Sequence, residues 1–510
     1  MYNWLRKIPR FATHQSIYLP TLPIRRQRRH NNNSGLAYNH HQQPSSSATE
    51  TARPPLPPMR TDSLSSSSID SFASSAYPAT WCTPYYHQLC RLLPSCPSYV
   101  LPAWCGRYRA FLIFLSIMLL QLCCFLLFCS IFFAPATLPA PVFPDKVLPM
   151  GEAARLLTLN IFMRPPGIKN NWSDYKDDRL DYIIHHILPH YDIIAFQESF
   201  GFATRRKDEL IKQARLRYGF NHHVESPRKY PWDISVDGGL LLLSKFKMAQ
   251  SGIIQYPRGT HSDWLSRKGA LYAMIELNPN RRFHMYTTHT QASYDLNNVI
   301  NLGDTYIRLG QFAQLHEFVD ATANTGGSSS SNSEEPVAPI MILGDLNVDA
   351  AVHPTGVPVT TPSVDSSIHY KMMTDVLKGI GADPKDLGLT DTPKQQRLFA
   401  HPWVLHDLED VVYKQYGYHP VTFGDVDVQQ DKTVVPGEVV LTDHDQLMTV
   451  QSIDRIYWAP RNSSTVSIRA PHVEPFKVKE NTRLSDQERE RLLFTQISDH
   501  YGISCSIHID

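Results

Sequence analysis

The residues of this chain that could do chemistry stand where apolar runs end. The run 339–343 is followed by Gly344, Asp345 and Asn347. A continuous apolar run of this kind predicts a strand buried on both faces. If the extended conformation continues past Gly344, Asp345 and Asn347 project from one face of the strand. A carboxylate and an amide so placed suit a phosphate that reacts beside a divalent cation, whereas a simple strand-end turn is the structural alternative.

Other apolar runs end in polar residues of the same kinds. In chain order these residues are Asn160 in the run 155–161, Glu198 after 192–197, His289 after 283–288, Asp454 in the run 452–458, and Asp499 and His500 after Ile497. Each has a structural alternative, because a single Glu after a strand is usually solvated and an Asp-His pair usually lies on the surface. The ordered set is more specific than any of its members.

The intervening segments predict a mixed α/β domain that positions these residues. Apolar residues recur at helical spacing from Leu180 to Leu188, where Pro189 ends the pattern, and again from Leu309 to Val319. Further strands are expected at 238–243 and 270–277. The segment from about 350 to 441 has poor periodicity and predicts an irregular, partly helical insertion.

The N-terminal part has a different composition. Residues 1–106 are rich in Ser, Pro and Arg and predict a disordered tail. Residues 107–134 contain an uncharged apolar run, 110–133, which is long enough to cross a hydrocarbon core of about 30 Å as a helix. Residues 135–151 predict a Pro-rich stalk, and 152–510 the folded domain.

The charges beside the apolar run predict its orientation. Arg107 and Arg109 precede it and Lys146 is the first basic residue after it, which predicts a single-pass type II protein with the domain in the lumen or outside the cell. The alternative is an apolar segment that dips into one leaflet and leaves the domain cytosolic. Asn171 and Asn462 begin glycosylation triplets on the predicted outer side.

The cysteines lie almost wholly outside the predicted domain. Of the 8 cysteines only Cys505 follows the apolar run, so no disulfide is expected within the domain. Cys96 and Cys105 beside the run are candidates for S-acylation.

The ordered set resembles the endonuclease/exonuclease/phosphatase superfamily. Its signature corresponds here to Asn160, Gln197-Glu198, Thr288-His289, Gly344-Asp345-Leu346-Asn347, Asp454 and Ser498-Asp499-His500, from about residue 152 onward. Two similar segments do not fit, since Gly424-Asp425-Val426-Asp427 lacks the Asn and Thr442-Asp443-His444 precedes Asp454. The resemblance implies an α/β (α+β) fold, a four-layer sandwich of two packed, mostly antiparallel sheets flanked by helices.

The resemblance also implies a role for each residue. Glu198 is the principal ligand of Mg²⁺ or Mn²⁺, with Asn160 and Asp499 as further ligands. His500 is the general base and Asp454 orients its ring. Asp345 and Asn347 hold the attacking water and a phosphoryl oxygen, and His289 donates to the phosphate, a contribution of about 2 to 4 kcal/mol.

Several segments resemble neutral sphingomyelinases in particular. They are Gly238-Gly239 with Ser244-Lys245, the stretch 256–271, and 288–292. Within 256–271, Asp263 and Lys268 stand at the separation at which an Asp and a Lys pair to switch the site in that group. The alternative is an exposed pair worth about 0 to 1 kcal/mol. Trp264 beside them either packs within its loop or enters a membrane interface.

The branch resemblance implies a substrate. It is sphingomyelin or a related membrane phosphosphingolipid, cleaved in the manner of a phospholipase C to ceramide and the phosphorylated headgroup. The alternatives are a membrane-tethered nuclease, a phosphoinositide phosphatase, and a receptor or scaffold that has lost catalysis. A net charge of +1 and the lack of an interleaved basic and aromatic groove argue against nucleic acid as a partner.

Overall fold

The computed structural model describes residues 103–168, 174–293, 301–324, 337–354, 358–389, 396–442, 446–462 and 465–510. The predicted tail up to residue 102, with Cys96, lies outside the described residues, as do Asn171, Asp443-His444 and Ser463-Ser464 of the triplet at Asn462.

In the described residues two six-stranded sheets form the centre of the domain. Sheet 1 has the order β15 (Val466–Glu474), β16 (Gly502–Ile509), β1 (Ala153–Met163), β2 (Ile193–Ser199), β4 (Leu241–Ser244), β3 (His222–Glu225). Sheet 2 has the order β5 (Lys247–Gln255), β6 (Gly269–Asn278), β7 (Arg281–His289), β8 (Ile340–Asp345), β14 (Asp454–Ala459), β9 (Glu409–Asp410). Only the pairs β1–β2 and β7–β8 of these sheets are parallel.

The two sheets pack face to face through apolar side chains of their central strands. Leu156, Ala195 and Leu242 of sheet 1 share one buried cluster with Met285 and Leu343 of sheet 2. Because both faces of each sheet are covered, the central strands read as continuous apolar runs, as β8 does with every residue buried.

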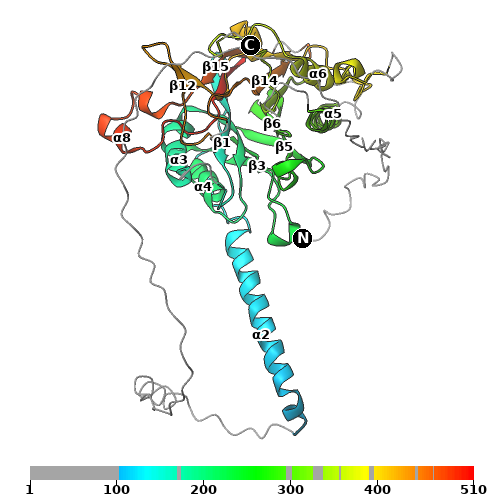
Figure 1. Cartoon of the computed structure of the whole chain (residues 1–510), viewed down its shortest axis with the longest axis vertical. Coiled ribbons are helices and arrows are strands. Elements are labelled where there is room, and N and C mark those ends of the chain that lie inside the picture. Colours follow the sequence, from blue (N-terminus) through cyan, green and yellow to red (C-terminus); the bar gives the residue numbers. More distant parts are fainter. Residues whose placement is uncertain are drawn as a thin grey trace, which may run out of the picture. The chain divides into compact units, whose positions relative to one another are not determined.

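Helices cover the outer face of each sheet (Figure 1). On sheet 1 lie α3 (Lys176–Tyr182), a π-helical continuation (Ile183–Ile187) and α4 (Arg206–Tyr218), which share a buried cluster with β1 and β2. On sheet 2 lie α5 (Leu302–Ala323) and α6 (Ile368–Leu377), whose apolar faces cover β6, β7 and β8. Four layers result, so the predicted α/β sandwich of two mostly antiparallel sheets is confirmed.

The segment before the domain forms one long helix, α2 (Ala103–Phe132). Its stretch Tyr108–Phe132 is long and apolar enough to cross a membrane. In the described part of this stretch nearly all the large apolar side chains are exposed, as a span that meets lipid requires.

The insertion is more regular than the sequence predicts. Besides α6 it contains β9, α7 (Val411–Tyr416), β10 (Phe423–Gly424), β11 (Val426–Val428) and β12 (Val434–Pro436). β9 pairs with β14 and extends sheet 2, while β10 pairs with β13 (Val450–Gln451), which follows the insertion. A short helix, α8 (Asp486–Arg491), precedes β16. The insertion therefore extends sheet 2 through β9, covers it with α6, and forms a separate two-stranded sheet through β10.

Candidate active site

The ends of strands from both sheets meet at one place. In sheet 2, Asp345 at the end of β8 lies opposite Asp454 on β14 and opposite His289 on β7. In sheet 1, Asn160 on β1 lies beside Gln197 on β2, directly before Glu198. The packed sheets bring the two groups together, because Asn160 Nδ2 donates to Asp345 Oδ2 at 3.0 Å.

The chain turns after β8 instead of continuing as a strand. Gly344 has a φ of +134°, and a Cβ there would lie 2.1 Å from the carbonyl oxygen of Thr288. Asn347 has a φ of 49°, and its backbone N–H donates to Asp345 Oδ1 at 3.0 Å. The expectation that Asp345 and Asn347 share one strand face is therefore wrong, because a turn closed by the carboxylate brings them together.

His500 is held by two buried neighbours. Its Nδ1 lies 3.0 Å from Asp454 Oδ2, and its Nε2 lies 3.3 Å from Asn160 Nδ2. Because the Asn160 amide can only donate at that atom, Nε2 accepts and Nδ1–H donates to Asp454. This tautomer leaves Nε2 able to take a proton, as a general base requires.

Buried carboxylates dominate the electrostatics of this cluster. Burial lowers the pKa of His500, but Asp454, Asp345 and Asp499 together raise it to about 10. Burial raises the pKa of Asp345 to about 6, although the charge of His500 opposes the rise. Burial also sets the pKa of His289 well below its ordinary value, helped by the charges of Lys268 and His500, so His289 is neutral.

Glu198 and Asp499 place two further carboxyl groups at the cavity. Burial raises the pKa of both carboxyls, that of Asp499 to about 7, and the charge of Glu198 contributes to the rise at Asp499. Glu198 Oε2 is buried and has no hydrogen-bond partner in the described residues. A buried carboxylate oxygen without a partner is costly, and a hard divalent cation would satisfy it.

A second set of atoms could also hold a cation. Asp345, Asp454 and His500 offer ligand atoms that all lie within 4.8 Å of one another. Since the His500 Nδ1 and Asp454 Oδ2 atoms bond to each other, this set is better suited to proton transfer, while Glu198 and Asp499 offer the all-oxygen environment that Mg²⁺ prefers. The described residues therefore fit a divalent metal.

A cavity of about 340 Å³ opens onto these groups. The predicted residues among its lining are Glu198, Asp263, Lys268, His289, Asp345, Asn347, Asp499 and His500. Asn160 and Asp454 lie behind it, bonded to His500. All of the predicted site residues are thus brought together.

Asp263 and Lys268 form a buried pair, so the alternative of an exposed pair is wrong. Lys268 Nζ donates to Asp263 Oδ2 at 2.8 Å and to the carbonyl of Thr290 at 2.7 Å. The same Asp263 oxygen accepts from the Ala292 N–H at 2.8 Å. The pair therefore ties its loop to the backbone that follows His289.

Several lining residues are absent from the sequence prediction. Phe423, Gln446 and Gln451 form a wall of the cavity, and the ring of Phe423 lies 4.9 Å from that of His500. Arg164 also lines the cavity, and its charge opposes the rise in the pKa of Glu198 and Asp499. Arg164 could have been expected at the site because it follows Asn160 by four residues in the same segment. Phe423 and Gln451 lie in strands of two residues, which no sequence pattern predicts.

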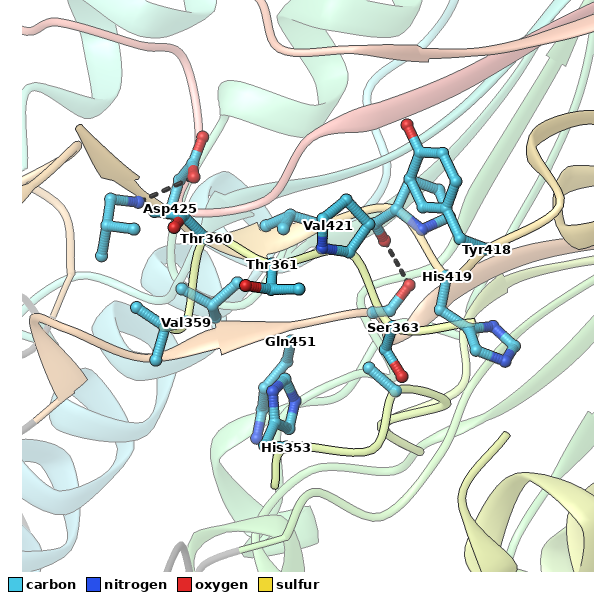
Figure 2. Close-up of a pocket in the computed structure, with 16 residues that line it drawn as sticks. His353, Val359, Thr360, Thr361, Ser363, Tyr418, His419, Val421, Asp425 and Gln451 are labelled. Atoms are coloured by element: carbon cyan, nitrogen blue, oxygen red, sulfur yellow. Dashed lines mark hydrogen bonds between the residues drawn. The ribbon is translucent and has the colours of Figure 1, made fainter. Parts of the chain in front are cut away.

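A second cavity of about 280 Å³ lies by the insertion. Figure 2 shows its polar lining, including His353, Thr361, Tyr418 and Asp425. Gln451 lines both cavities, but the second contains none of the predicted site residues. The Asp425 carboxylate accepts from the hydroxyl of Tyr501, and Asp425 lines the second cavity and not the first.

Three of the likenesses to known proteins are described here. A sphingomyelinase of Dictyostelium discoideum is 26% identical over 71% of this chain and 100% of its own. A phospholipase C of Staphylococcus aureus is 26% identical over 50% of this chain and 84% of its own. A crystal structure of beta toxin from Staphylococcus aureus is 17% identical with a TM-score of 0.41, over 69% of this chain and 99% of that chain. No protein-family model matches.

The strand-end residues and their order are similar to those of the endonuclease/exonuclease/phosphatase superfamily. The two of these relatives that were found by sequence are named as a sphingomyelinase and a phospholipase C.

Proposed function

We propose that the chain is a Mg²⁺-dependent hydrolase of sphingomyelin or a related phosphosphingolipid, which it cleaves to ceramide and the phosphorylated headgroup. One observation carries the proposal: the His500–Asp454 pair and the carboxylates of Glu198 and Asp499 face a single cavity. A general base and an oxygen-ligand set at one cavity are what hydrolysis of a phosphodiester by activated water requires.

Glu198 would hold the cation, with Asn160 and Asp499 as further ligands, and Mn²⁺ suits the same donors. Asn160 Oδ1 accepts from the Phe162 N–H at 3.0 Å and keeps a second lone pair for the metal. When bound, the cation supplies positive charge that stabilises the departing oxygen.

The residues around the cavity perform the proton transfers. His500 Nε2 takes a proton from water while the water oxygen bonds to phosphorus, and the bond from phosphorus to the ceramide oxygen breaks. Asp454 stabilises the imidazolium that forms. Asp345 and Asn347 hold the water and a phosphoryl oxygen, and His289 donates to the phosphate. The proton on His500 then passes to the ceramide oxygen.

The carboxylates of Asp454, Asp345 and Asp499 raise the pKa of His500 to about 10. Asp499 is the smallest of these contributions, and neutralising its charge lowers the pKa of His500 and so favours the neutral ring that acts as a base. The proposed metal and the proposed base are thus linked electrostatically.

A lipid substrate is favoured by the names of the relatives and by the loop at the cavity. Lys268 is paired with Asp263 and bonded to Thr290 next to His289. We extend the proposal to this pair as a switch: breaking it frees the backbone that positions His289. Lys268→Ala should then lower turnover by more than its effect on thermal stability accounts for.

The full chain in detergent micelles tests the proposal with sphingomyelin, an inositol phosphosphingolipid and duplex DNA, each with and without Mg²⁺. Lipid hydrolysis that needs Mg²⁺ supports it, whereas hydrolysis of DNA alone would favour the nuclease alternative. Glu198→Gln and His500→Ala should each remove nearly all turnover. Asp425→Asn, a change at an acid outside the catalytic cluster, serves as the matched control and should not.

We also propose the type II arrangement predicted from Arg107 and Arg109, with the domain lumenal or extracellular. In intact cells a glycosidase-sensitive mass that Asn171→Gln removes supports this side. Its absence, together with protection of the domain from added protease, would favour the cytosol.

A further inference from the structure

Two exposed turns carry large apolar side chains. Trp232 and Ile234 lie in and after the turn Pro231–Asp233 and are 56% and 67% exposed. Trp264 and Leu265 lie at and after the end of the turn His261–Trp264 and are 46% and 48% exposed. Apolar side chains of this size gathered at turn tips mark an interaction surface rather than ordinary surface composition.

The two turns form one surface, here named the double-turn surface and defined by Trp232, Ile234, Trp264 and Leu265. The Val236 N–H donates to the Leu265 carbonyl at 2.8 Å, which joins the segments that follow the turns. Arg258 lies between them: its guanidinium is 4.1 Å from the centre of the Trp264 ring, and its Nη1 donates to the carbonyls of Ile234 and Trp264, each at 3.2 Å. These bonds hold the apolar tips in fixed relation.

The double-turn surface borders the catalytic cavity. Leu265 belongs to both, and Val236 and Ser262 of the same segments also line the cavity. Any partner that covers the double-turn surface therefore lies next to the cavity opening.

Aromatic contacts connect the double-turn surface to α2. The Tyr230 ring stacks on Trp232 with centroids 4.8 Å apart, and Trp232 lies 6.3 Å from Phe125, within the apolar stretch of α2. Phe133, directly after α2, lies 6.3 Å from Tyr230 and 4.9 Å from Phe202. A single apolar environment around α2 would therefore also reach the double-turn surface.

The charges around the turns indicate which partner fits. Lys229, Arg258 and Arg267 flank the apolar tips, and Trp with Arg or Lys is the combination that favours the headgroup region of a bilayer. A protein partner would not need to follow the apolar stretch of α2, whereas a lipid surface does so necessarily.

We propose that the double-turn surface inserts into the headgroup region of the bilayer that α2 enters, and so holds the opening of the catalytic cavity next to lipids of the same membrane. The docking stands on the surface itself; its catalytic consequence, hydrolysis of lipid in the same leaflet, rests on the proposed function.

The first test measures docking without activity. The full chain is placed in phosphatidylcholine vesicles with and without brominated acyl chains, which quench tryptophan fluorescence on contact. Wild type should be quenched, and Trp232→Ser with Trp264→Ser should remove a large part of the quenched signal. An unchanged quenched signal overturns the proposal. So does a dimer that the same double variant dissolves, because the surface would then belong to a second copy.

The second test separates docking from catalysis. The triple variant Trp232→Ser, Ile234→Ser, Trp264→Ser should lose about tenfold in turnover of sphingomyelin in vesicles, yet stay within about twofold on a short-chain, water-soluble phosphodiester. Leu493→Ser, which changes an apolar side chain that is 67% exposed elsewhere, should alter neither rate. Equal losses on both substrates overturn the proposal, since the turns would then shape the cavity. If wild type hydrolyses neither substrate, the proposed function fails while the quenching still decides docking.

Discussion

Replacement of Asp454 by Asn removes one negative charge from the bond that holds His500 and leaves the size of the side chain almost unchanged. Asp454 Oδ2 lies 3.0 Å from His500 Nδ1, both groups are buried, and Asp454 is the largest of the influences that raise the pKa of His500. The substitution therefore tests the electrostatic role of Asp454 with little disturbance of packing.

The size of the effect follows from the bond that is changed. A hydrogen bond to a charged group contributes about 1.5 to 3 kcal/mol, which corresponds to a loss of about 10- to 150-fold in kcat. If the introduced amide turns its NH₂ group to His500, the ring takes the wrong tautomer and the loss approaches about 10⁴-fold. We expect kcat to fall within these limits.

The pH profile distinguishes this role from a structural one. Activity needs neutral His500, so the acidic limb of kcat follows its pKa. Because Asp454 raises that pKa, Asp454→Asn should move the limb to lower pH. The assay is kcat against pH on sphingomyelin with saturating Mg²⁺, with Asp425→Asn as the control whose limb stays in place. A normal kcat, or a reduced kcat with an unmoved limb, would refute the reasoning.

Three further results are expected. Burial raises the pKa of Asp499 to about 7, so below that pH Mg²⁺ must displace a proton from this carboxyl group in order to bind. The affinity for Mg²⁺, measured by calorimetry, should therefore fall about tenfold per pH unit at pH values well below that pKa. A flat profile would contradict the assignment of Asp499 as a ligand. In chemical denaturation, Gly344→Ala should lower the free energy of unfolding by about 2 to 4 kcal/mol, since its Cβ would lie 2.1 Å from the Thr288 oxygen. The control Gly388→Ala, at a φ of +71° in open space, should lower it by about 1 kcal/mol. Arg179→Met should cost about 3 to 5 kcal/mol, because this buried side chain donates to the carbonyls of Ile161, Phe162 and Ile497; a change in melting temperature under about 2 °C would show that these bonds are dispensable.

The central strands could be predicted from the sequence, but the edge strands could not. β1, β2 and β8 are covered on both faces, so nearly every position in them is buried and the strands appear in the sequence as continuous apolar runs. β5 lies at the edge of sheet 2 and most of its residues are exposed, so little in its composition marks a strand. Its structure depends on pairing with β6, which no local pattern reveals.

The sequence predicts which residues lie together at the candidate site, but their local geometry could not be predicted. The order of Asn160, Glu198 and His500 along the chain signals the cluster. The left-handed backbone of Asn347 is stabilised by a bond to the Asp345 carboxylate, and spacing alone favours the extended alternative. Phe423 reaches His500 through β10, a strand of two residues whose pairing with β13 has no signature in the sequence.

The pairing of β1 with β16 has a consequence for biosynthesis. Ala153 lies opposite His508, so the inner edge of β1 stays open on the ribosome until residues 502–509 have emerged, long after α2 has been made. Contacts this distant in sequence form late and slowly. The nascent chain therefore holds an unfinished sheet edge for most of its synthesis, and a chaperone that shields this edge would raise the yield of folded protein more than one that assists the helices.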